Sequence, residues 1–220
     1  MKIATWNVAR PTKNSKRIPE ILDHIKNVDA DILVLTETND VLDLGNSYNC
    51  FYSSKPTEDI FKEGEKRIAI YSKYPAIGPI ETFRSDTSIC INLDTPIGNI
   101  AVYGTIIGNT GNKSKDFIID LTAQLNDFDR ISKTNNLCIC GDLNISFSDN
   151  YYFTSEGRDK LNKAFETLEL LNLTAGIHEN IDHIILPKKL IDNKNVVNGK
   201  WNKPVDKKLS DHMGVFVIIS

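Results

Sequence analysis

The sequence predicts an α/β fold with mixed β-sheets. Short apolar runs of strand length recur along the chain. Strand–helix–strand units occur in each half, and antiparallel hairpins lie between them. This pattern is typical of two sheets that pack face to face with helices outside.

In the first half, the predicted elements alternate between strand and helix. Residues 2–8 are a predicted buried strand, and residues 18–28 carry apolar side chains at helical spacing. Residues 31–36 form a continuous apolar run, as expected of a strand that is buried on both faces. An irregular segment is predicted at 40–66, with a short strand at 48–52, and a further strand at 67–72.

The second half begins with a predicted hairpin. Residues 88–93 and 99–105 are rich in strand formers, and the turn sequence at 94–98 separates them. Two apolar stripes at helical spacing follow, at 117–131 and 161–168. The remaining predicted strands are 137–140, 181–186 and 214–219.

Length and composition are typical of one globular domain, which we expect to span residues 1–220. Apolar residues make up 40% of the chain and charged residues 25%. No apolar run approaches the roughly 20 residues of a membrane helix, and the N-terminal sequence lacks the apolar region of a signal peptide. We therefore expect a cytoplasmic, monomeric protein without a membrane partner.

The cysteines do not form a convincing metal or disulfide framework. Cys138 and Cys140 lie two apart on an apolar strand, so both point to one face. With Cys50 and Cys90, they are interpreted as small core residues, and reduced cysteines suit a cytosolic protein.

Net charge does not indicate a nucleic-acid-binding protein. The formal value is −3, whereas a large phosphate-binding surface usually brings a basic balance. Lysines are nonetheless concentrated between Pro187 and Leu209. This segment is either a solvated lysine loop or a rim that steers phosphate toward an acidic pocket.

Acids, amides and one histidine occur repeatedly where a predicted strand begins or ends. Strand ends let a rigid scaffold bring distant residues to one pocket. Hard oxygen ligands and a histidine suit a divalent metal and the attack of water on phosphate. These residues are Asn7, Glu37, Asp142, Asn144, Asp182, Asp211 and His212.

Six segments resemble the endonuclease/exonuclease/phosphatase superfamily, whose members have a DNase I-like fold. The segments are IATWNV (3–8), DILVLTET (31–38), RIAIYSKYP (67–75), CGDLN (140–144), IDHIIL (181–186) and LSDHMGV (209–215), in the family's order. The resemblance implies a four-layer α/β sandwich, in which two mixed β-sheets lie face to face with helices outside. It also implies a phosphoester hydrolase that uses Mg²⁺ or Mn²⁺.

The resemblance implies metal-binding residues at the ends of the first two predicted strands and in the LSDHMGV motif. Glu37 matches the family's metal-binding glutamate, and a carboxylate after an apolar strand needs a cation or a partner. Asp211 matches a metal- or water-binding acid. Asn7 matches a strand-end asparagine that would orient Glu37, a metal-bound water or a phosphate oxygen.

The resemblance also assigns catalytic roles. Asp142 would position or deprotonate the attacking water, and Asn144 would donate to the phosphoryl oxygen as charge develops. His212 would be a general acid or electrostatic catalyst, with Asp182 fixing its tautomer. The expected substrate-binding residues are Asn7, Asn109, Lys207 and Lys208.

The resemblance fails where family members carry a His or Tyr after a central strand. The aligned position is Ile106, so either Thr105 replaces that residue or the phosphate contact is missing. Ala9 stands where some DNA-repair members have an aspartate, which leaves abasic-site specificity open. His183 is interpreted as structural, and Trp201 either stacks on a base or anchors its own loop.

Three functions are compatible with these observations. The leading hypothesis is a metal-dependent nuclease that hydrolyses DNA or RNA by in-line attack of water. The second is a phosphatase for a small phosphoester, which the short chain and the acidic balance favour. The third is a binding domain of the same fold with impaired catalysis, which the loss at Ile106 favours.

Overall fold

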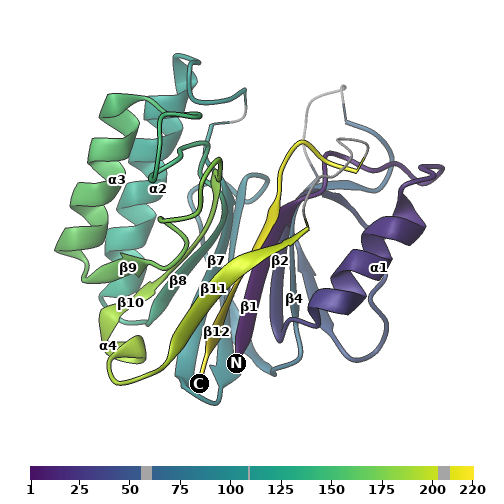
Figure 1. Ribbon diagram of the computed structural model, residues 1–220, viewed down its shortest axis with the longest axis horizontal. Coiled ribbons are helices and arrows are strands. Elements are labelled where there is room, and N and C mark those ends of the chain that lie inside the picture. The colour runs from purple at the N-terminus through teal and green to yellow at the C-terminus, as the bar shows by residue number, and fades with distance from the viewer. Residues whose placement is uncertain (56–60, 109, 203–208) are drawn as a thin grey trace.

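The computed structural model describes residues 1–55, 61–108, 110–202 and 209–220, which form two β-sheets that pack face to face (Figure 1). The first sheet has the strand order β11-β12-β1-β2-β4-β3. It combines strands from the beginning and the end of the sequence. These strands are β1 (Lys2–Asn7), β2 (Ile32–Asn39), β3 (Asn49–Tyr52), β4 (Glu65–Ser72), β11 (Val196–Asn202) and β12 (Gly214–Ile219).

The second sheet comes from the middle of the chain. Its strand order is β5-β6-β7-β8-β10-β9, and the predicted hairpin forms as β6 and β7. The strands are β5 (Ala76–Ile80), β6 (Ser88–Thr95), β7 (Gly98–Ile106), β8 (Leu137–Asp142), β9 (Leu170–Asn172) and β10 (Asp182–Pro187).

Both sheets are mixed, and their registers bring the predicted site residues to one end of the sandwich. β1 runs parallel to β2, with Asn7 opposite Thr36. β8 runs antiparallel to β10, with Asp142 opposite Asp182. The carboxyl ends of β1, β2 and β8 and the amino end of β10 therefore lie at the same end of the molecule (Figure 1).

Helices cover the outer faces of both sheets (Figure 1). Ile21 and Ile25 of α1 pack on the first sheet with Trp6 and Leu33. α2 and α3 lie over the second sheet, where Phe117 and Leu161 join a separate apolar cluster. The order helix, sheet, sheet, helices confirms the predicted four-layer α/β sandwich. The long helices are α1 (Ile18–Val28), α2 (Asp116–Ser132) and α3 (Ser155–Thr167).

An apolar core with side chains from both sheets holds the sandwich together. It includes Val34 and Ile70 of the first sheet and Val102 and Ile184 of the second. The backbones approach closely at Gly104 of β7, where a Cβ atom would lie 2.9 Å from Cγ2 of Ile68 on β4. As predicted, Cys138 and Cys140 both belong to this core, and all four cysteines are free thiols.

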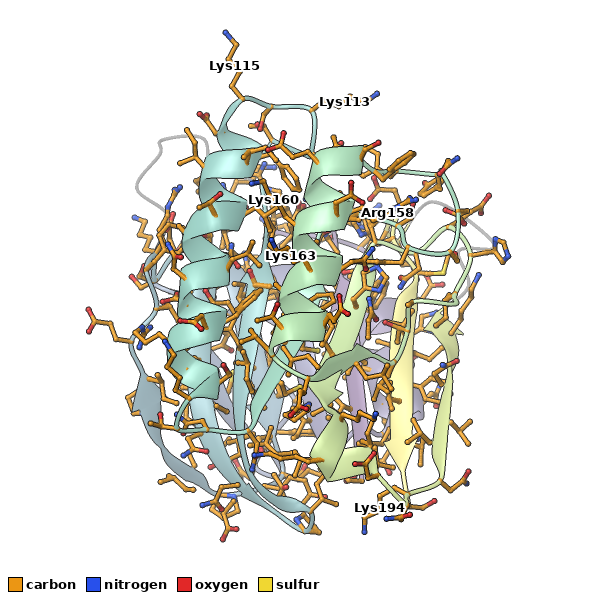
Figure 2. The ribbon with its side chains drawn as sticks, turned by 90° about the vertical axis from the view of Figure 1, so that its left-hand side faces the viewer. Lys113, Lys115, Arg158, Lys160, Lys163 and Lys194 are labelled. Carbon is orange, nitrogen blue, oxygen red and sulfur yellow. The ribbon has the colours of Figure 1, made fainter. Side chains whose placement is uncertain are left out.

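The lysine-rich segment after Pro187 was not predicted to form regular structure, but α4 (Lys188–Ile191) and β11 occupy its described part. β10 starts at Asp182 and carries the chain to the opposite end of the sandwich before Lys188 and Lys189. Figure 2 shows Lys194 at that same end. A phosphate-steering role of these three lysines is therefore wrong, while Lys203, Lys207 and Lys208 lie outside the described residues.

Trp201 anchors β11 to the first sheet. Its Nε1 donates to the carbonyl oxygen of Val215 at 3.1 Å. Its ring packs edge-on against Trp6, with the ring centroids 5.2 Å apart. Of the two interpretations of Trp201, anchoring of its own segment is correct. No helix in the described residues is long and apolar enough to cross a membrane.

Candidate active site

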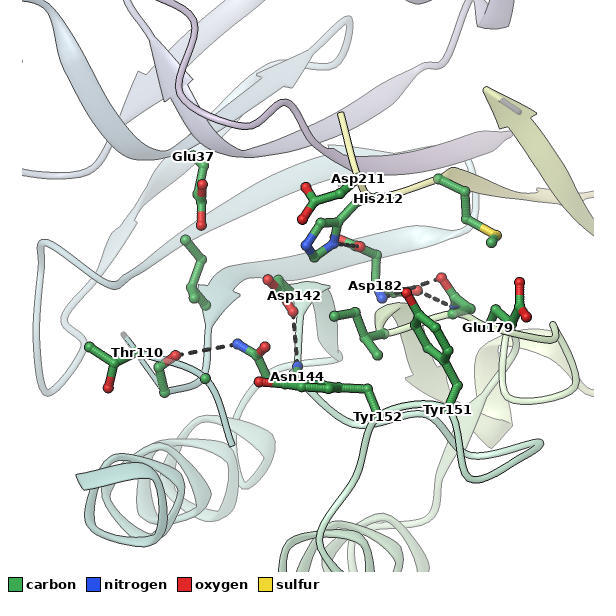
Figure 3. A pocket seen from close by; sticks show the side chains of 16 residues that line it. Glu37, Thr110, Asp142, Asn144, Tyr151, Tyr152, Glu179, Asp182, Asp211 and His212 are labelled. Atoms are coloured by element: carbon green, nitrogen blue, oxygen red, sulfur yellow. Dashed lines mark hydrogen bonds and ion pairs between the residues drawn. The ribbon is translucent and has the colours of Figure 1, made fainter. Parts of the chain in front are cut away.

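A cavity of about 390 Å³ opens between the two sheets, at the end where the predicted site residues converge (Figure 3). Figure 3 shows Glu37, Asp211 and His212 on one side, and Asp142 and Asn144 facing them. The first group belongs to β2 and to the loop before β12. In the second group, Asp142 is the last residue of β8 and Asn144 lies just after it. The cavity is lined by Glu37, Ile106, Gly108, Thr110, Gly111, Asp142, Asn144, Tyr151, Tyr152, Glu179, Asn180, Ile181, Asp182, Asp211, His212 and Met213.

Asp182 and His212 form a buried ion pair across the two sheets. Oδ2 of Asp182 lies 2.6 Å from Nδ1 of His212, and the two side chains are 1% and 14% exposed. Burial alone lowers the pKa of His212, but the charges of Asp182 and Asp142 and the hydrogen bond to Asp182 outweigh it and raise the pKa from 6.5 to about 10. His212 therefore carries a proton on Nδ1 and presents Nε2 to the cavity.

Asp142 is held by a hydrogen bond at each carboxylate oxygen. Nδ2 of Asn7 donates to Oδ2 at 3.2 Å, and the backbone N–H of Asn144 donates to Oδ1 at 2.9 Å. Burial raises the pKa of Asp142 from 3.8 to about 7, against the opposing charge of His212. Asn7 thus orients Asp142 rather than Glu37. It is not among the residues that line the cavity, and its Oδ1 accepts from the backbone N–H of Ala9.

Glu37 lies within β2 and not after it, and its backbone is left-handed, with φ 48°. Residues other than glycine rarely adopt this conformation, which costs about 1–3 kcal/mol and occurs preferentially at functional sites. Pairing with β4 continues on both sides, through Thr36 and Thr38. The carboxylates of Glu37 and Asp211 face the cavity and make no hydrogen bond or ion pair with another residue that the structure describes.

The charge of the cavity fits a bound divalent cation. Five of its lining residues carry carboxylates and one is a histidine, whereas its described lining contains no lysine or arginine. An anionic phosphoester would be repelled here unless a cation were present. Glu37 and Asp211 suit Mg²⁺, which usually binds one or two carboxylates and keeps several waters. Across the described residues, no group of three or more His, Cys, Asp or Glu side chains could enclose an ion, so an open site fits better than a closed one.

Asn144 holds the loop after β7 in the structure. Its Nδ2 donates to the carbonyl oxygens of Ile107 at 3.0 Å and Gly108 at 3.3 Å. Oδ2 of Asp120 on α2 accepts from the backbone N–H of Gly108 at 2.6 Å, so the loop is fixed from both sides. The sequence predicted that the amide of Asn144 donates to a phosphoryl oxygen, but in this arrangement its donors are engaged by backbone carbonyls.

Thr105 does not replace the His or Tyr of related proteins. It is fully buried and donates a hydrogen bond to Oε1 of Gln124 on α2, so it faces away from the cavity. Ile106, the next residue on β7, lines the cavity instead, because neighbouring side chains of a strand point to opposite faces. The cavity wall is apolar at this position. The hypothesis that Thr105 replaces the phosphate-contacting His or Tyr is therefore wrong.

The loop that carries Asp211 and His212 is tied to the end of β1. Ser210 Oγ donates to the carbonyl oxygen of Asn7 at 2.6 Å and accepts from the backbone N–H of His212 at 3.0 Å. Trp6 Nε1 donates to the carbonyl oxygen of His212 at 3.1 Å. These bonds fix the position of the histidine relative to the first sheet.

His183 is structural, as predicted, and faces away from the cavity. It is fully buried, and its Nε2 lies 2.9 Å from the carbonyl oxygen of Ile145. Among the predicted substrate-binding residues, Asn109, Lys207 and Lys208 lie outside the described residues.

Several lining residues were not predicted from the sequence. Tyr151 and Tyr152 come from the loop between β8 and α3, and Glu179 and Asn180 come from the segment before β10. These segments lack periodic patterns, so only the tertiary structure shows that they meet. The one local signal is the nearness of Asn180 to the predicted motif at 181–186.

The sequence matches the model of the Endonuclease/Exonuclease/phosphatase family over residues 4–212. The chain belongs to this family. It is therefore a phosphoester hydrolase, as the resemblance implied. No significant match was found among curated proteins.

Solved structures of similar fold cover nearly all of the chain. An AP endonuclease from Archaeoglobus fulgidus is 18% identical, with coverage of 100% of this chain and 99% of that chain and a TM-score of 0.75. A 3′–5′ exonuclease from Neisseria meningitidis is 16% identical, with full coverage of both chains and a TM-score of 0.73. A 3′ phosphatase from Neisseria, bound to a product DNA hairpin, is 16% identical, covers 100% and 99% of the two chains and has a TM-score of 0.72. At these identities the similarity establishes the shared fold.

Proposed function

We propose that this protein is a divalent-metal-dependent phosphodiester hydrolase that acts on nucleic acid. The observation that carries the proposal is the cavity in which carboxylates from both sheets surround the Asp182–His212 pair. A carboxylate–histidine pair beside carboxylates that could bind a metal ion suits metal-assisted attack of water on phosphorus.

Glu37 and Asp211 are the proposed metal ligands, because their carboxylates line the cavity and make no hydrogen bond or ion pair with another described residue. A bound Mg²⁺ or Mn²⁺ ion would offset the negative charge of the phosphoryl oxygens. Asp142 accepts a proton from the attacking water. Its hydrogen bonds with Asn7 and with the backbone of Asn144 fix both oxygens for this task.

His212 is the proposed electrostatic catalyst. Asp182 occupies Nδ1 and fixes the orientation of the ring, which leaves the Nε2–H to donate to a phosphoryl oxygen as charge develops there. Asn144 acts as a positioning residue, since its side chain holds the loop of Gly108 and its backbone holds Asp142.

Two lysines at the same end of the molecule as the cavity favour a polymeric substrate. Thr110 and Gly111 line the cavity, and the exposed side chains of Lys113 and Lys115 follow in the same loop. Figure 2 shows both lysines at the end of the molecule where the cavity opens. Phosphates flanking the scissile bond of a nucleic acid could reach these lysines, whereas a small phosphoester could not. One of the similar structures, the phosphatase bound to a product DNA hairpin, gives further support.

The test is hydrolysis by the purified protein of supercoiled plasmid, single-stranded DNA, RNA and a panel of phosphomonoesters, each with Mg²⁺, Mn²⁺ or EDTA. We expect cleavage of a nucleic acid with metal and none with EDTA. The Asp142→Asn variant, purified in the same way, controls for a contaminating nuclease. Activity on the nucleic acids that persists in EDTA would refute the metal role, and no hydrolysis of any substrate would favour the impaired binding domain.

A phosphatase for small phosphoesters is the second candidate. The described lining of the cavity carries no lysine or arginine to hold a polymer, and the formal net charge of the chain is −3. This function predicts turnover of phosphomonoesters with no cleavage of DNA or RNA.

The salt dependence of DNA hydrolysis tests whether Lys113 and Lys115 contact a polymeric substrate. We expect the double variant Lys113→Gln/Lys115→Gln to flatten the dependence of KM on salt for DNA, by up to about 0.9 in the logarithmic slope for each phosphate that is no longer neutralised. The double variant Lys188→Gln/Lys189→Gln removes the same charge at the opposite end of the sandwich and is the matched control. Equal slopes for both variants and wild type would show that Lys113 and Lys115 do not contact the DNA.

A further inference from the structure

We propose that Tyr151 is a stacking platform for a nucleobase next to the scissile phosphate. This inference rests on the proposed function, because it names the part of a nucleic acid that the rim of the same cavity would bind. Tyr151 was not among the residues to which the sequence or the family resemblance assigned a role.

Tyr151 is an exposed aromatic residue on the rim of the cavity. It lines the cavity and is nevertheless 57% exposed. Figure 3 shows Tyr151 and Tyr152 on the side of the cavity away from Glu37, near Asp182 and Asn144. Among the described residues, the ring of Tyr151 has no aromatic or cationic neighbour, and its hydroxyl has no hydrogen-bond partner. Its faces are therefore available to a ligand.

The backbone around Tyr151 is rigidly held. The backbone N–H of Tyr151 donates to Oδ1 of Asp149 at 3.0 Å, and the backbone N–H of Ser146 donates to the carbonyl oxygen of Tyr152 at 2.7 Å. Oδ2 of Asp149 accepts from the backbone N–H of Glu179 at 2.8 Å, which joins this loop to the neighbouring rim segment. A ring presented by a fixed loop loses little conformational freedom when a base stacks on it.

The size and charge of the cavity place a base at this rim. A volume of about 390 Å³ lies near the lower limit of ligand pockets, roughly 300–1,000 Å³. A phosphate with its metal and sugar would fill most of this space, so the attached base would lie outside. Every base has a π-face that can stack on an aromatic ring, so a tyrosine at this rim could bind any base. Stacking needs no positive charge and is compatible with an acidic wall.

The experiment compares two substrates that share a backbone. One is a short single-stranded oligonucleotide, and the other is an oligomer of the same length in which tetrahydrofuran residues replace every nucleoside. kcat/KM is measured on both with Mg²⁺ for wild type, Tyr151→Ala, Tyr151→Phe and Phe83→Ala. Phe83 is the matched control, since it is 43% exposed and is not among the residues that line the cavity.

Tyr151→Ala should lower kcat/KM on the oligonucleotide by about 5- to 150-fold, the usual effect of one base–aromatic stack. It should leave the base-free oligomer unchanged. Tyr151→Phe keeps the ring and should match wild type on both substrates, as should Phe83→Ala. Loss of the same factor on both substrates, or a defect in Tyr151→Phe, would overturn the stacking role. Wild-type protein that cleaves neither these oligomers nor plasmid DNA nor RNA would refute the proposed function instead, so the two failures are distinguishable.

Discussion

Acid should destabilise this protein through His183, and the structure gives the magnitude. The ring is fully buried, its Nε2 donates to the carbonyl oxygen of Ile145 at 2.9 Å, and its Nδ1 accepts from Nδ2 of Asn172 at 3.3 Å. Burial lowers the pKa of His183 from 6.5 to about 4. A second ring proton would have to displace the donor at Nδ1, so the folded protein holds this histidine neutral.

The sign of the effect follows from proton uptake. Between pH 6.5 and 4 the unfolded chain binds a proton at His183 and the folded protein does not, so the free energy of unfolding falls as the pH falls. Above pH 6.5 both states are neutral at this residue and the contribution is constant. From pKa values of 6.5 and about 4, the loss between pH 7.5 and pH 5 is about 2 kcal/mol.

Urea denaturation at pH 7.5 and pH 5, in EDTA and constant salt, measures this loss. The His183→Gln variant is the control, because its amide can still donate toward the carbonyl oxygen of Ile145 but does not titrate. We expect wild type to lose about 2 kcal/mol more than the variant between the two pH values. The difference cancels other titrating groups that the two proteins share, such as Asp142. Equal losses in both proteins would refute the assignment of His183 as buried and neutral.

Three further predictions concern the site and its support. Gly141 has φ 138°, and a Cβ atom there would overlap the carbonyl oxygen of Thr105. Gly141→Ala should therefore lower the free energy of unfolding by on the order of 2 kcal/mol, and an unchanged urea midpoint would contradict this. Asp182→Asn should lower kcat by about 10²- to 10⁴-fold without changing the far-UV circular dichroism, since it removes the carboxylate that orients His212. A kcat within a few-fold of wild type would show that Asp182 has no part in the mechanism. Glu37→Gln should raise the Mg²⁺ concentration for half-maximal activity by about 10-fold or more, and a metal titration identical to wild type would show that Glu37 is not a ligand.

Apolar periodicity predicted the parts of the fold that are buried. The helix predicted at 18–28 has the same bounds in the structure, where Ile21 and Ile25 face the first sheet. β11 was missed because it is an edge strand, and its sequence intersperses Asn198 and Lys200 with apolar residues. Edge strands carry polar residues because one side of them is unpaired, which weakens the pattern that identifies strands.

The convergence of the candidate site could be predicted from strand ends, but the contacts within it could not. Asp142, Asp182 and His212 meet because sheet register brings their strand ends together. The hydrogen-bond partner of each side chain depends on backbone groups that are far away in the sequence. Asn144 donates to carbonyls of a loop that is 36 and 37 residues away in sequence, and no local pattern encodes that pairing. The φ of 48° at Glu37 likewise cannot be inferred from a run of strand-forming residues.

The close approach of the sheets at Gly104 has a consequence for the proposed active site, which lies between the same two sheets. Glu37 and His212 belong to one sheet and its loops, and Asp142 and Asp182 to the other, so small shear displacements between the sheets change the separation of the reacting groups. The gap is set by apolar packing around Gly104 and Ile68, and densely packed interiors transmit such strain. We therefore expect substitutions around Gly104 and Ile68 to change the reaction rate as well as the stability of the protein.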